Sequence, residues 1–348
     1  MNQLKNTLPI LGITMGDPAG VGPEIIVKAL NEPRIAEICT PIVIGDASIM
    51  KRAVEIVGIS MKVQSIKNIR DFHPLSGIIT VLDQNSIMVD NLKMGSVSAM
   101  AGKAAYLAIE KVIDLALKNE IDGTVTAPLN KEALHKAGYT FSGHTEIYAH
   151  LTKTKDYTMM LADGKFRVTH VSTHVSLREA CDRVKKERIL TVIKLSNDVC
   201  RTLGILHPSI GVAGLNPHAG ENGLFGREEI EEITPAIEQA IKLGIDAQGP
   251  IPPDSLFAKH NSGYYDIVVA MYHDQGHIPT KLVGFNFNKE TPEKASLSGI
   301  NITLGLPIIR TSVDHGTAFD LAGKGIANHG SMMQAIEYGA LLARAKLN

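Results

Sequence analysis

The chain has 348 residues, of which 44% are hydrophobic and 20% charged, and its formal net charge is -1. This length suits two domains or one large α/β unit with a substantial core, and the composition excludes a fibrous or disordered class. Acidic and basic residues are mixed along the chain, so no basic stripe indicates nucleic acid as a partner.

Apolar runs of strand length alternate with longer helical patterns, which predicts stacked β-α units and an α/β fold. Parallel strands covered on both faces are typically continuous apolar runs of this kind. The predicted strands are Ile10–Thr14, Pro41–Ile44, Ile78–Leu82, Gly123–Thr126, Thr158–Leu161, Arg167–His170, Ile210–Ala213 and Ile267–Met271.

Helical periodicity lies between these strands. Pro23 suits a first helical turn, where a missing N–H costs nothing. The predicted helices are Pro23–Leu30, Ser98–Lys118, Lys131–Ala137, Glu146–Leu151, Leu177–Cys181, Glu187–Leu203, Glu228–Leu243 and Met332–Ala345.

The chain is expected to change domain twice. Residues 1–138 and 300–348 would form one α/β lobe, and residues 139–299 a central α/β lobe, with a cleft between the lobes. The polar stretch Asn286–Gly299 has weak periodicity and is predicted to be a loop.

Cysteine usage favours a reducing compartment. Cys39, Cys181 and Cys200 are an odd, widely spaced set without CxxC, which indicates neither a disulfide framework nor a thiolate zinc site. The first residues lack a signal-peptide pattern, and no run of about 18 apolar residues predicts a membrane span. We therefore expect a cytoplasmic protein without a membrane partner.

Three histidines each follow a predicted strand. They are His174 in RVTHVSTH, His218 in SIGVAGLNPH and His273 in IVVAMYH. Ligands of open α/β sheets collect beyond the carboxyl ends of parallel strands, so these imidazoles are candidates for one divalent metal site. Each histidine alone is also typical of an ordinary core or surface residue. An open three-histidine site would favour a catalytic metal over a structural one.

A glycine-rich turn, Thr14–Glu24, joins the first strand to the first helix. It is either an anion-binding helix start or a tight structural turn. It matches neither GxGxxG nor a Walker loop, so neither a dinucleotide fingerprint nor a nucleoside triphosphatase follows.

Other polar residues near predicted strand ends are candidates for anion binding. His144 and Thr145 lie at a predicted helix start, where they either donate hydrogen bonds to an anion or cap the helix. Lys281, Asn301 and Arg310 are either ligand contacts or surface groups, and Arg310 suits a phosphate or carboxylate.

Several long motifs resemble the 4-hydroxythreonine-4-phosphate dehydrogenase (PdxA) family. They are GDPAGVGPE, SGHTE, GLNPHAGE, MYHDQG and NITLGLPIIRTSVDHGTAFDLAGKG, and they span nearly the whole chain. The last one is also similar to the HGSAPDIAGKGIANP stretch of isopropylmalate dehydrogenases. The resemblance implies the two-lobed isocitrate/isopropylmalate dehydrogenase-like fold and an NAD-dependent, metal-dependent β-decarboxylating dehydrogenase.

The resemblance also implies roles for individual residues and a homodimer whose metal site draws ligands from both subunits. By motif, the metal ligands are His174, His218 and His273. The substrate-binding positions are His144, Thr145, Lys281, Asn301 and Arg310. The adenosine end of NAD is expected near His315, Gly316, Thr317, Ala318 and Asp320.

The implied reaction oxidises a hydroxy acid at a metal-chelated hydroxyl and then decarboxylates the β-keto acid. Lys281 is the candidate for proton transfer or for anchoring the substrate. Asp274 is a candidate for orienting His273 or assisting proton transfer. Imidazole ligands suit Zn, Co or Ni, and substrate oxygens would also allow Mg or Mn.

Two features indicate the second branch of the family. About eleven extra residues separate Lys281 from Asn301 relative to the vitamin B6 enzymes, and His277 follows the glycine of HDQG. That branch resembles enzymes that convert 4-phospho-D-threonate or 4-phospho-D-erythronate to dihydroxyacetone phosphate. The alternative substrate is 4-phosphohydroxy-L-threonine of pyridoxal phosphate synthesis. Other classes are a metal-dependent hydrolase or acyl-phosphate transferase, or an inactive sugar-phosphate sensor.

Overall fold

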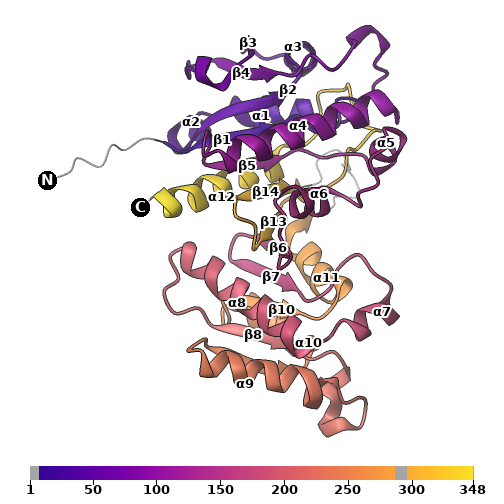
Figure 1. The fold of residues 1–348 in the computed structure, drawn as a ribbon, viewed down its shortest axis with the longest axis vertical. Coiled ribbons are helices and arrows are strands. Elements are labelled where there is room, and N and C mark those ends of the chain that lie inside the picture. The colour runs from indigo at the N-terminus through magenta and orange to yellow at the C-terminus, as the bar shows by residue number, and fades with distance from the viewer. Residues whose placement is uncertain (1–7, 287–295, 348) are drawn as a thin grey trace, which may run out of the picture. The chain divides into compact units, whose positions relative to one another are not determined.

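The structure is a computed structural model that describes residues 8–286 and 296–347. These residues form two compact units, coloured by position along the chain in Figure 1. Unit 1 contains residues 8–154, 296–300 and 306–347, and unit 2 contains residues 155–286 and 301–305.

Unit 1 is built on parallel strands in the order β3-β4-β2-β1-β5-β14. Residues 11–14 of β1 and 42–45 of β2 are buried, as expected for a sheet covered on both faces. The strands are β1 (Ile10–Thr14), β2 (Thr40–Gly45), β3 (Lys62–Ile66), β4 (Ile78–Asp83), β5 (Gly123–Thr126) and β14 (Arg310–Val313).

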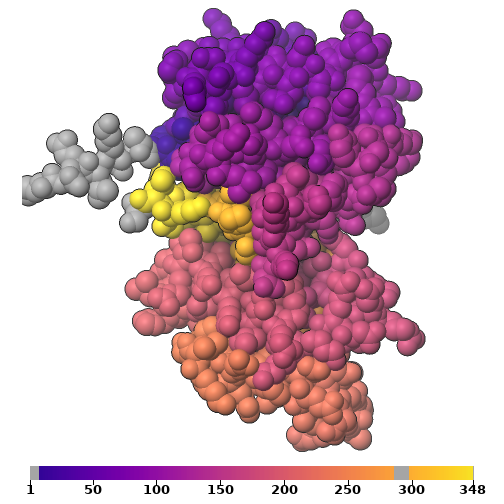
Figure 2. Space-filling view, in the orientation of Figure 1, coloured from indigo at the N-terminus to yellow at the C-terminus, as the bar shows by residue number. Residues whose placement is uncertain are grey.

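Helices cover this sheet. Ile109 and Val112 of α4 share one core cluster with Ile42 and Ile44 of β2, and Ser98 caps α4 by accepting the Ala101 N–H. Figure 2 shows the carboxyl-terminal helix α12 (yellow) at the surface of this unit. The helices are α1 (Gly22–Leu30), α2 (Pro33–Ile38), α3 (Ala47–Val57), α4 (Ala99–Leu117), α5 (Lys131–Lys136), α6 (His144–Leu151) and α12 (Gly330–Leu347), with 3₁₀ turns η1 (Ile69–Asp71) and η2 (Val89–Asn91).

Unit 2 has the strand order β13-β6-β7-β10-β8-β9. Strands β6 and β7 are antiparallel, whereas β7, β10, β8 and β9 run parallel to one another. The strands are β6 (Thr158–Asp163), β7 (Phe166–His170), β8 (Ile210–Ala213), β9 (Ala247–Ile251), β10 (Ile267–Ala270) and β13 (Ile300–Leu304).

The helical segments of unit 2 follow the parallel strands, and the buried face of α8 packs on β7, β8 and β10. They are α7 (Leu177–Asp182), α8 (Lys186–Thr202), the 3₁₀ segment η3 (Pro217–Gly223), the π-helical η4 (Glu229–Ile233), α9 (Thr234–Lys242), α10 (Pro253–Asn261) and α11 (His273–Gly284). Two-residue strands β11 (Phe285–Asn286) and β12 (Ser296–Leu297) complete the described elements.

The predicted α/β class, the eight predicted strands and the eight predicted helices are confirmed, with ends that shift by at most two residues. The predicted helix Glu228–Leu243 differs in that it begins with the π-helical segment η4. Residues 139–154, expected in the central lobe, belong to unit 1, where Tyr148 of α6 is fully buried in the same core cluster as β2. Most of the predicted loop Asn286–Gly299 lies outside the described residues. No helix among the described residues is long and apolar enough to cross a bilayer.

Candidate metal and substrate sites

The three candidate metal ligands follow three neighbouring parallel strands of unit 2. His174 lies beyond β7, His273 begins α11 directly after β10, and His218 lies in η3 after β8. Strand β10 pairs in parallel with β7 on one side and β8 on the other. All three imidazoles therefore lie past the same carboxyl edge of the sheet, as the sequence predicts.

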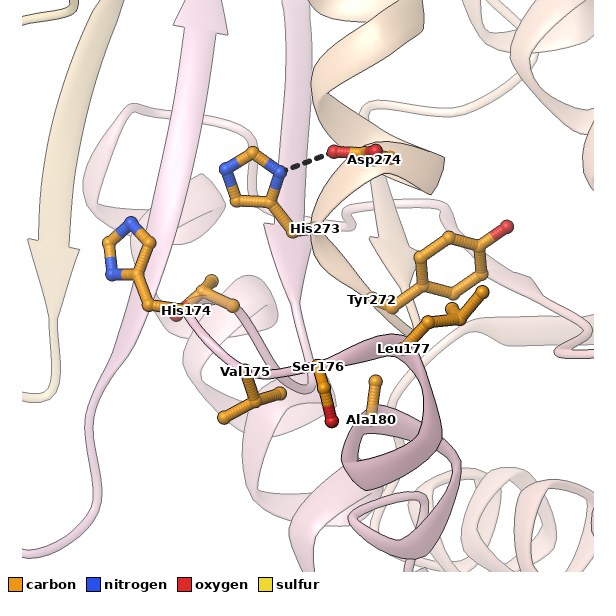
Figure 3. A pocket seen from close by; sticks show the side chains of 9 residues that line it. His174, Val175, Ser176, Leu177, Ala180, Tyr272, His273 and Asp274 are labelled. Atoms are coloured by element: carbon orange, nitrogen blue, oxygen red, sulfur yellow. Dashed lines mark hydrogen bonds and ion pairs between the residues drawn. The ribbon is translucent and has the colours of Figure 1, made fainter.

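His174 and His273 line one pocket of about 410 Å³. Their ring centroids are 5.8 Å apart, and Figure 3 shows the two rings carried by different segments on the same side of the pocket. Val175, Leu177 and Tyr272 give the pocket an apolar wall. The pocket thus combines two imidazoles with both apolar and polar lining residues, the latter including Ser176 and Asp274.

Asp274 contacts one of these imidazoles. Its Oδ1 lies 2.7 Å from Nδ1 of His273, drawn as a dashed line in Figure 3, and this contact leaves Nε2 available as a ligand. A carboxylate on the far nitrogen is a common partner of metal-binding histidines, so the donor set fits a divalent metal. No group of three histidine, cysteine, aspartate or glutamate residues that could hold a metal ion occurs among residues 8–286 and 296–347 of one chain.

Two further histidines lie behind His273. His277 stacks on His273 with a centroid distance of 3.6 Å and an interplanar angle of 9°, and His170 lies 4.8 Å from His277. Burial is the main cause, and the neighbouring His273 the second, that lowers the pKa of His277 to about 4. Burial lowers the pKa of His170 well below its usual value. Both rings are therefore neutral near pH 7 and add no positive charge behind the pocket.

His218 lies on a backbone turn of unusual conformation. Residues 218–222 all have positive φ, between 44° and 80°, and four of these five residues are not glycine. Left-handed backbone costs a non-glycine residue roughly 1–2 kcal/mol, so surrounding contacts must hold this turn. The His218 side chain itself is exposed.

A glutamine links the segments that carry His218 and His273. Gln275 of α11 accepts the Met271 N–H and donates to the Gly214 carbonyl, at 2.6 and 2.8 Å. The ends of β10 and β8 are thus fastened to each other by one buried side chain.

In unit 1 a buried arginine lies near the start of α6. Arg310 is 3% exposed, donates to the Thr126 hydroxyl at 3.1 Å and lies 5.7 Å from the Tyr148 ring centroid. Burial lowers the pKa of Arg310 to about 10, so it remains a cation at neutral pH.

His144 lies near the same arginine. Burial and the nearby Arg310 charge lower its pKa well below the usual value, and its Nε2 is buried without a hydrogen-bond partner in the described part of the chain. Gly143 is the N-cap of α6, so neither His144 nor Thr145 serves as the helix cap. A buried cation beside an unpartnered imidazole fits an anionic ligand such as a phosphate or carboxylate.

Lys281 and Asn301 belong to unit 2. Lys281 lies on α11, the helix that begins with His273, and its Nζ is 4.2 Å from the centroid of the Phe285 ring. Asn301 lies on β13 and its amide contacts the Met159 sulfur. Both side chains are held by local contacts within this unit.

The candidate NAD residues lie on the segment between β14 and α12 of unit 1. Gly316 is exposed, with open space where a Cβ would lie, and Ala318 has a positive φ of 42°. The Thr317 carbonyl accepts the Val21 N–H at 3.0 Å. The glycine-rich turn after β1 therefore packs on this segment, which supports its interpretation as a structural turn.

Several buried polar residues that contact the segments carrying the candidate side chains are not predicted by the sequence patterns. They are Glu24, His170, Gln275 and Glu229, and all four are buried polar groups with specific contacts or neighbours. Two of them lie in recognisable motifs, since Glu24 ends GDPAGVGPE and Gln275 lies in MYHDQG. The backbone groups to which these two side chains hydrogen-bond include ones that are distant in sequence.

A family model described as "Pyridoxal phosphate biosynthetic protein PdxA" matches residues 37–339. A protein of Cupriavidus necator named D-threonate 4-phosphate dehydrogenase is 46% identical over 341 residues, covering 98% of this chain and 99% of the relative.

Solved structures give the same fold. A 4-hydroxythreonine-4-phosphate dehydrogenase from Burkholderia phymatum is 46% identical, with a TM-score of 0.81 and coverage of 97% and 99% of the two chains. A second one, from Klebsiella pneumoniae, is 43% identical with a TM-score of 0.83 and coverage of 96% and 99%. Relatives of similar identity thus carry names with different substrates.

Proposed function

Because the chain belongs to the PdxA family, we propose that it oxidises and decarboxylates 4-phospho-D-threonate with NAD, giving dihydroxyacetone phosphate and carbon dioxide. The near full-length similarity to the Cupriavidus necator D-threonate 4-phosphate dehydrogenase carries this proposal. The long connection after Lys281 and the histidine after HDQG favour the same branch.

The reaction transfers a hydride from C3 to NAD while the C3 hydroxyl loses its proton. The resulting β-keto acid then loses C1 as carbon dioxide, and its bonding electrons pass to C2, which takes up a proton. When bound, a divalent metal ion supplies Lewis-acid polarisation and NAD supplies the hydride acceptor.

We assign the metal to His174, His218 and His273, with Asp274 orienting His273. The chemistry of the donor set supports this assignment, because two imidazoles already face one pocket and one of them has a carboxylate on its far nitrogen. Zn, Co or Ni suits these ligands, and oxygens of the substrate extend the choice to Mg or Mn.

Arg310, His144 and Thr145 of unit 1 are proposed to bind an anionic group of the substrate. The buried guanidinium and the unpartnered His144 nitrogen support this role. Lys281 and Asn301 of unit 2 are proposed as further substrate contacts, with Lys281 transferring a proton. The loop containing His315, Gly316, Thr317, Ala318 and Asp320 is proposed to bind the adenosine end of NAD.

We also propose a homodimer in which both subunits contribute metal ligands. The absence of a three-ligand group among the described residues of one chain is compatible with such a shared site.

A specific alternative is oxidation of 4-phosphohydroxy-L-threonine, the reaction named for the Burkholderia phymatum and Klebsiella pneumoniae relatives. This substrate carries an amine where threonate carries a hydroxyl at C2. The two substrates therefore differ by a few hydrogen bonds, which can discriminate strongly when the binding groups are buried.

The test compares 4-phospho-D-threonate, 4-phospho-D-erythronate and 4-phosphohydroxy-L-threonine with metal-supplemented enzyme and NAD, following NADH absorbance and carbon dioxide. We expect the highest kcat/KM with 4-phospho-D-threonate. Preference for the amino acid would overturn the assignment, and preference for the erythronate would correct its stereochemistry. Hydrolysis without NADH formation would exclude a dehydrogenase.

A further inference from the structure

A buried carboxylate accepts hydrogen bonds from the residues just before the turn that carries His218. Glu229 of η4 is 3% exposed, and its Oε1 accepts the N–H groups of Leu215 and Asn216 at 2.8 and 2.7 Å. Its Oε2 accepts from the Asn216 amide at 3.0 Å. One side chain therefore binds three donors in the two residues that enter the turn.

The turn is shaped to fit this carboxylate. A Cβ on Gly220 would lie 2.7 Å from Oε2 of Glu229, and a Cβ on Gly214 would lie 3.2 Å from Oε1. Glu228 adds a second anchor, because its Oε2 accepts from the Asn216 amide at 2.7 Å. The two glycines thus let the backbone wrap closely around the Glu229 carboxylate.

An exposed loop does not need a left-handed backbone for solubility or burial. Strained backbone persists when surrounding contacts over-determine it, and such strain clusters where a side chain must be held in one position. Here the strained residues begin at His218, two residues after Asn216. The Glu229 carboxylate accepts hydrogen bonds from Leu215 and Asn216 just before the turn, and it lies against Gly220 within the turn.

We propose that Glu229 is a positioning residue that fixes the left-handed turn and thereby holds His218 ready to bind a metal ion. This inference rests on the metal assignment of the proposed function. Glu229 itself does not contact the metal or the substrate. Its carboxylate acts through the backbone of Leu215 and Asn216.

The test measures binding of Co²⁺ alone to the metal-free full chain, by calorimetry and by the visible absorption that reports histidine ligation. Glu229→Gln should weaken Co²⁺ binding roughly 10- to 100-fold and change the absorption, as for other residues that orient metal ligands. Glutamine keeps the size of the side chain but presents an N–H group to the Asn216 amide, which also donates.

Two further variants separate positioning from stability. Gly220→Ala places a methyl group against the same carboxylate from the turn side, and we expect the same loss of Co²⁺ affinity. Glu231→Gln is the matched control, because Glu231 lies on the same helix, is exposed and pairs with Arg227 instead. All titrations are made well below the melting temperature of each variant.

The outcomes are distinguishable. Loss of Co²⁺ affinity in His218→Ala, Glu229→Gln and Gly220→Ala, with Glu231→Gln unchanged, supports the inference. If His218→Ala loses affinity while folded Glu229→Gln and Gly220→Ala bind Co²⁺ like Glu231→Gln, the positioning role is wrong and the metal assignment stands. If His218→Ala binds Co²⁺ like the unmodified chain, the metal assignment fails, and the inference fails with it.

Discussion

Asp17 is a buried carboxyl at the carboxyl end of β1. Its Oδ1 accepts the Ala19 N–H at 2.9 Å, whereas Oδ2 is buried without a hydrogen-bond partner among the described residues. Burial raises the pKa of Asp17 from 3.8 to about 6. The folded state therefore holds this proton more tightly than the unfolded chain does.

The sign of the pH dependence follows from this pKa. Between about pH 4 and pH 6 the folded state binds more protons at Asp17 than the unfolded chain does. The contribution of Asp17 to the free energy of unfolding therefore falls as pH rises, and its destabilising effect is complete above about pH 6. Asp17→Asn, which imitates the protonated form, should therefore stabilise the protein at pH 8 by at most roughly 3 kcal/mol, and much less at pH 4.5.

Urea unfolding at the two pH values measures this difference. The exposed Asp90→Asn serves as the control, since it should change stability little at either pH. An equal effect of Asp17→Asn at pH 4.5 and pH 8 would contradict the raised pKa.

A second prediction concerns the role of the Asp274 carboxylate. If its carboxylate orients His273, Asp274→Asn should weaken metal binding roughly tenfold or more. If it transfers a proton instead, kcat should fall while metal affinity stays unchanged. Asp254→Asn is the matched control, because Asp254 also lies in the first turn of a helix, α10. Calorimetric titration with metal and steady-state kinetics distinguish the two roles.

For a single residue, the sequence gives the side chain but not the backbone conformation. His218 was a candidate ligand from its position after a strand, yet the turn contains Ala219 and Glu221, which do not by themselves predict positive φ. The contacts of Glu229 impose that conformation, and they depend on a residue that lies in the next element.

Two side chains of helix α1 bind the candidate NAD segment. Glu24 is 1% exposed, and its two oxygens accept the N–H groups of Gly323 and Gly325 at 2.6 and 2.8 Å. Lys28, one turn later, donates to the Ala327 carbonyl at 2.8 Å. The helix therefore holds the chain that follows Asp320.

Glu24→Gln should loosen this segment, because one of the two N–H groups would face an amide that also donates. We expect the KM for NAD to rise on the order of tenfold, with little change in the KM for the phosphorylated acid. Steady-state kinetics and NAD binding measured without substrate test this expectation. Exposed Glu37→Gln on α2 is the control, and an unchanged affinity for NAD in Glu24→Gln would contradict the coupling.

The elements that were not predicted lack the sequence pattern that normally indicates a helix or a strand. Helix α11 contains Gly276 and Pro279, two residues that normally end helices, and Gly276 is required because the His170 ring lies against it. Strand β3 is at the edge of its sheet and buries little besides Ile66, so its sequence lacks an apolar run. Periodicity reports burial, and it is silent where tertiary contacts or edge position decide.

For the whole molecule, the α/β class follows from alternating apolar runs, but the limits of the units do not. The sequence predicts a new lobe from residue 139 because Gly138 and Gly143 lie at this point of the chain. Tyr148 instead packs in the core of unit 1 and donates to the Thr124 hydroxyl at 3.0 Å. A boundary depends on long-range packing, which local composition does not record.

The proposed shared metal site makes a prediction about the assembly. Consider the variants His174→Ala, His218→Ala and His273→Ala, each expected to be inactive. Suppose that one subunit supplies two ligands of each metal site and its partner supplies the third. A heterodimer of two variants then has one intact site only when one substitution removes the third ligand and the other removes one of the first two. Two of the three pairings should then recover about half of the activity of the unmodified dimer.

Co-expression of each pair with two different affinity tags, followed by purification through both tags, isolates the heterodimers for assay. Pairing each variant with itself gives the baseline, and size-exclusion chromatography verifies that every sample is dimeric. Recovery in two pairings identifies the histidine that crosses to the partner, since it is common to both. If dimeric samples recover activity in none of the pairings, all three ligands come from one subunit, and the left-handed turn of His218 must then present its imidazole to the His174–His273 pocket of its own chain.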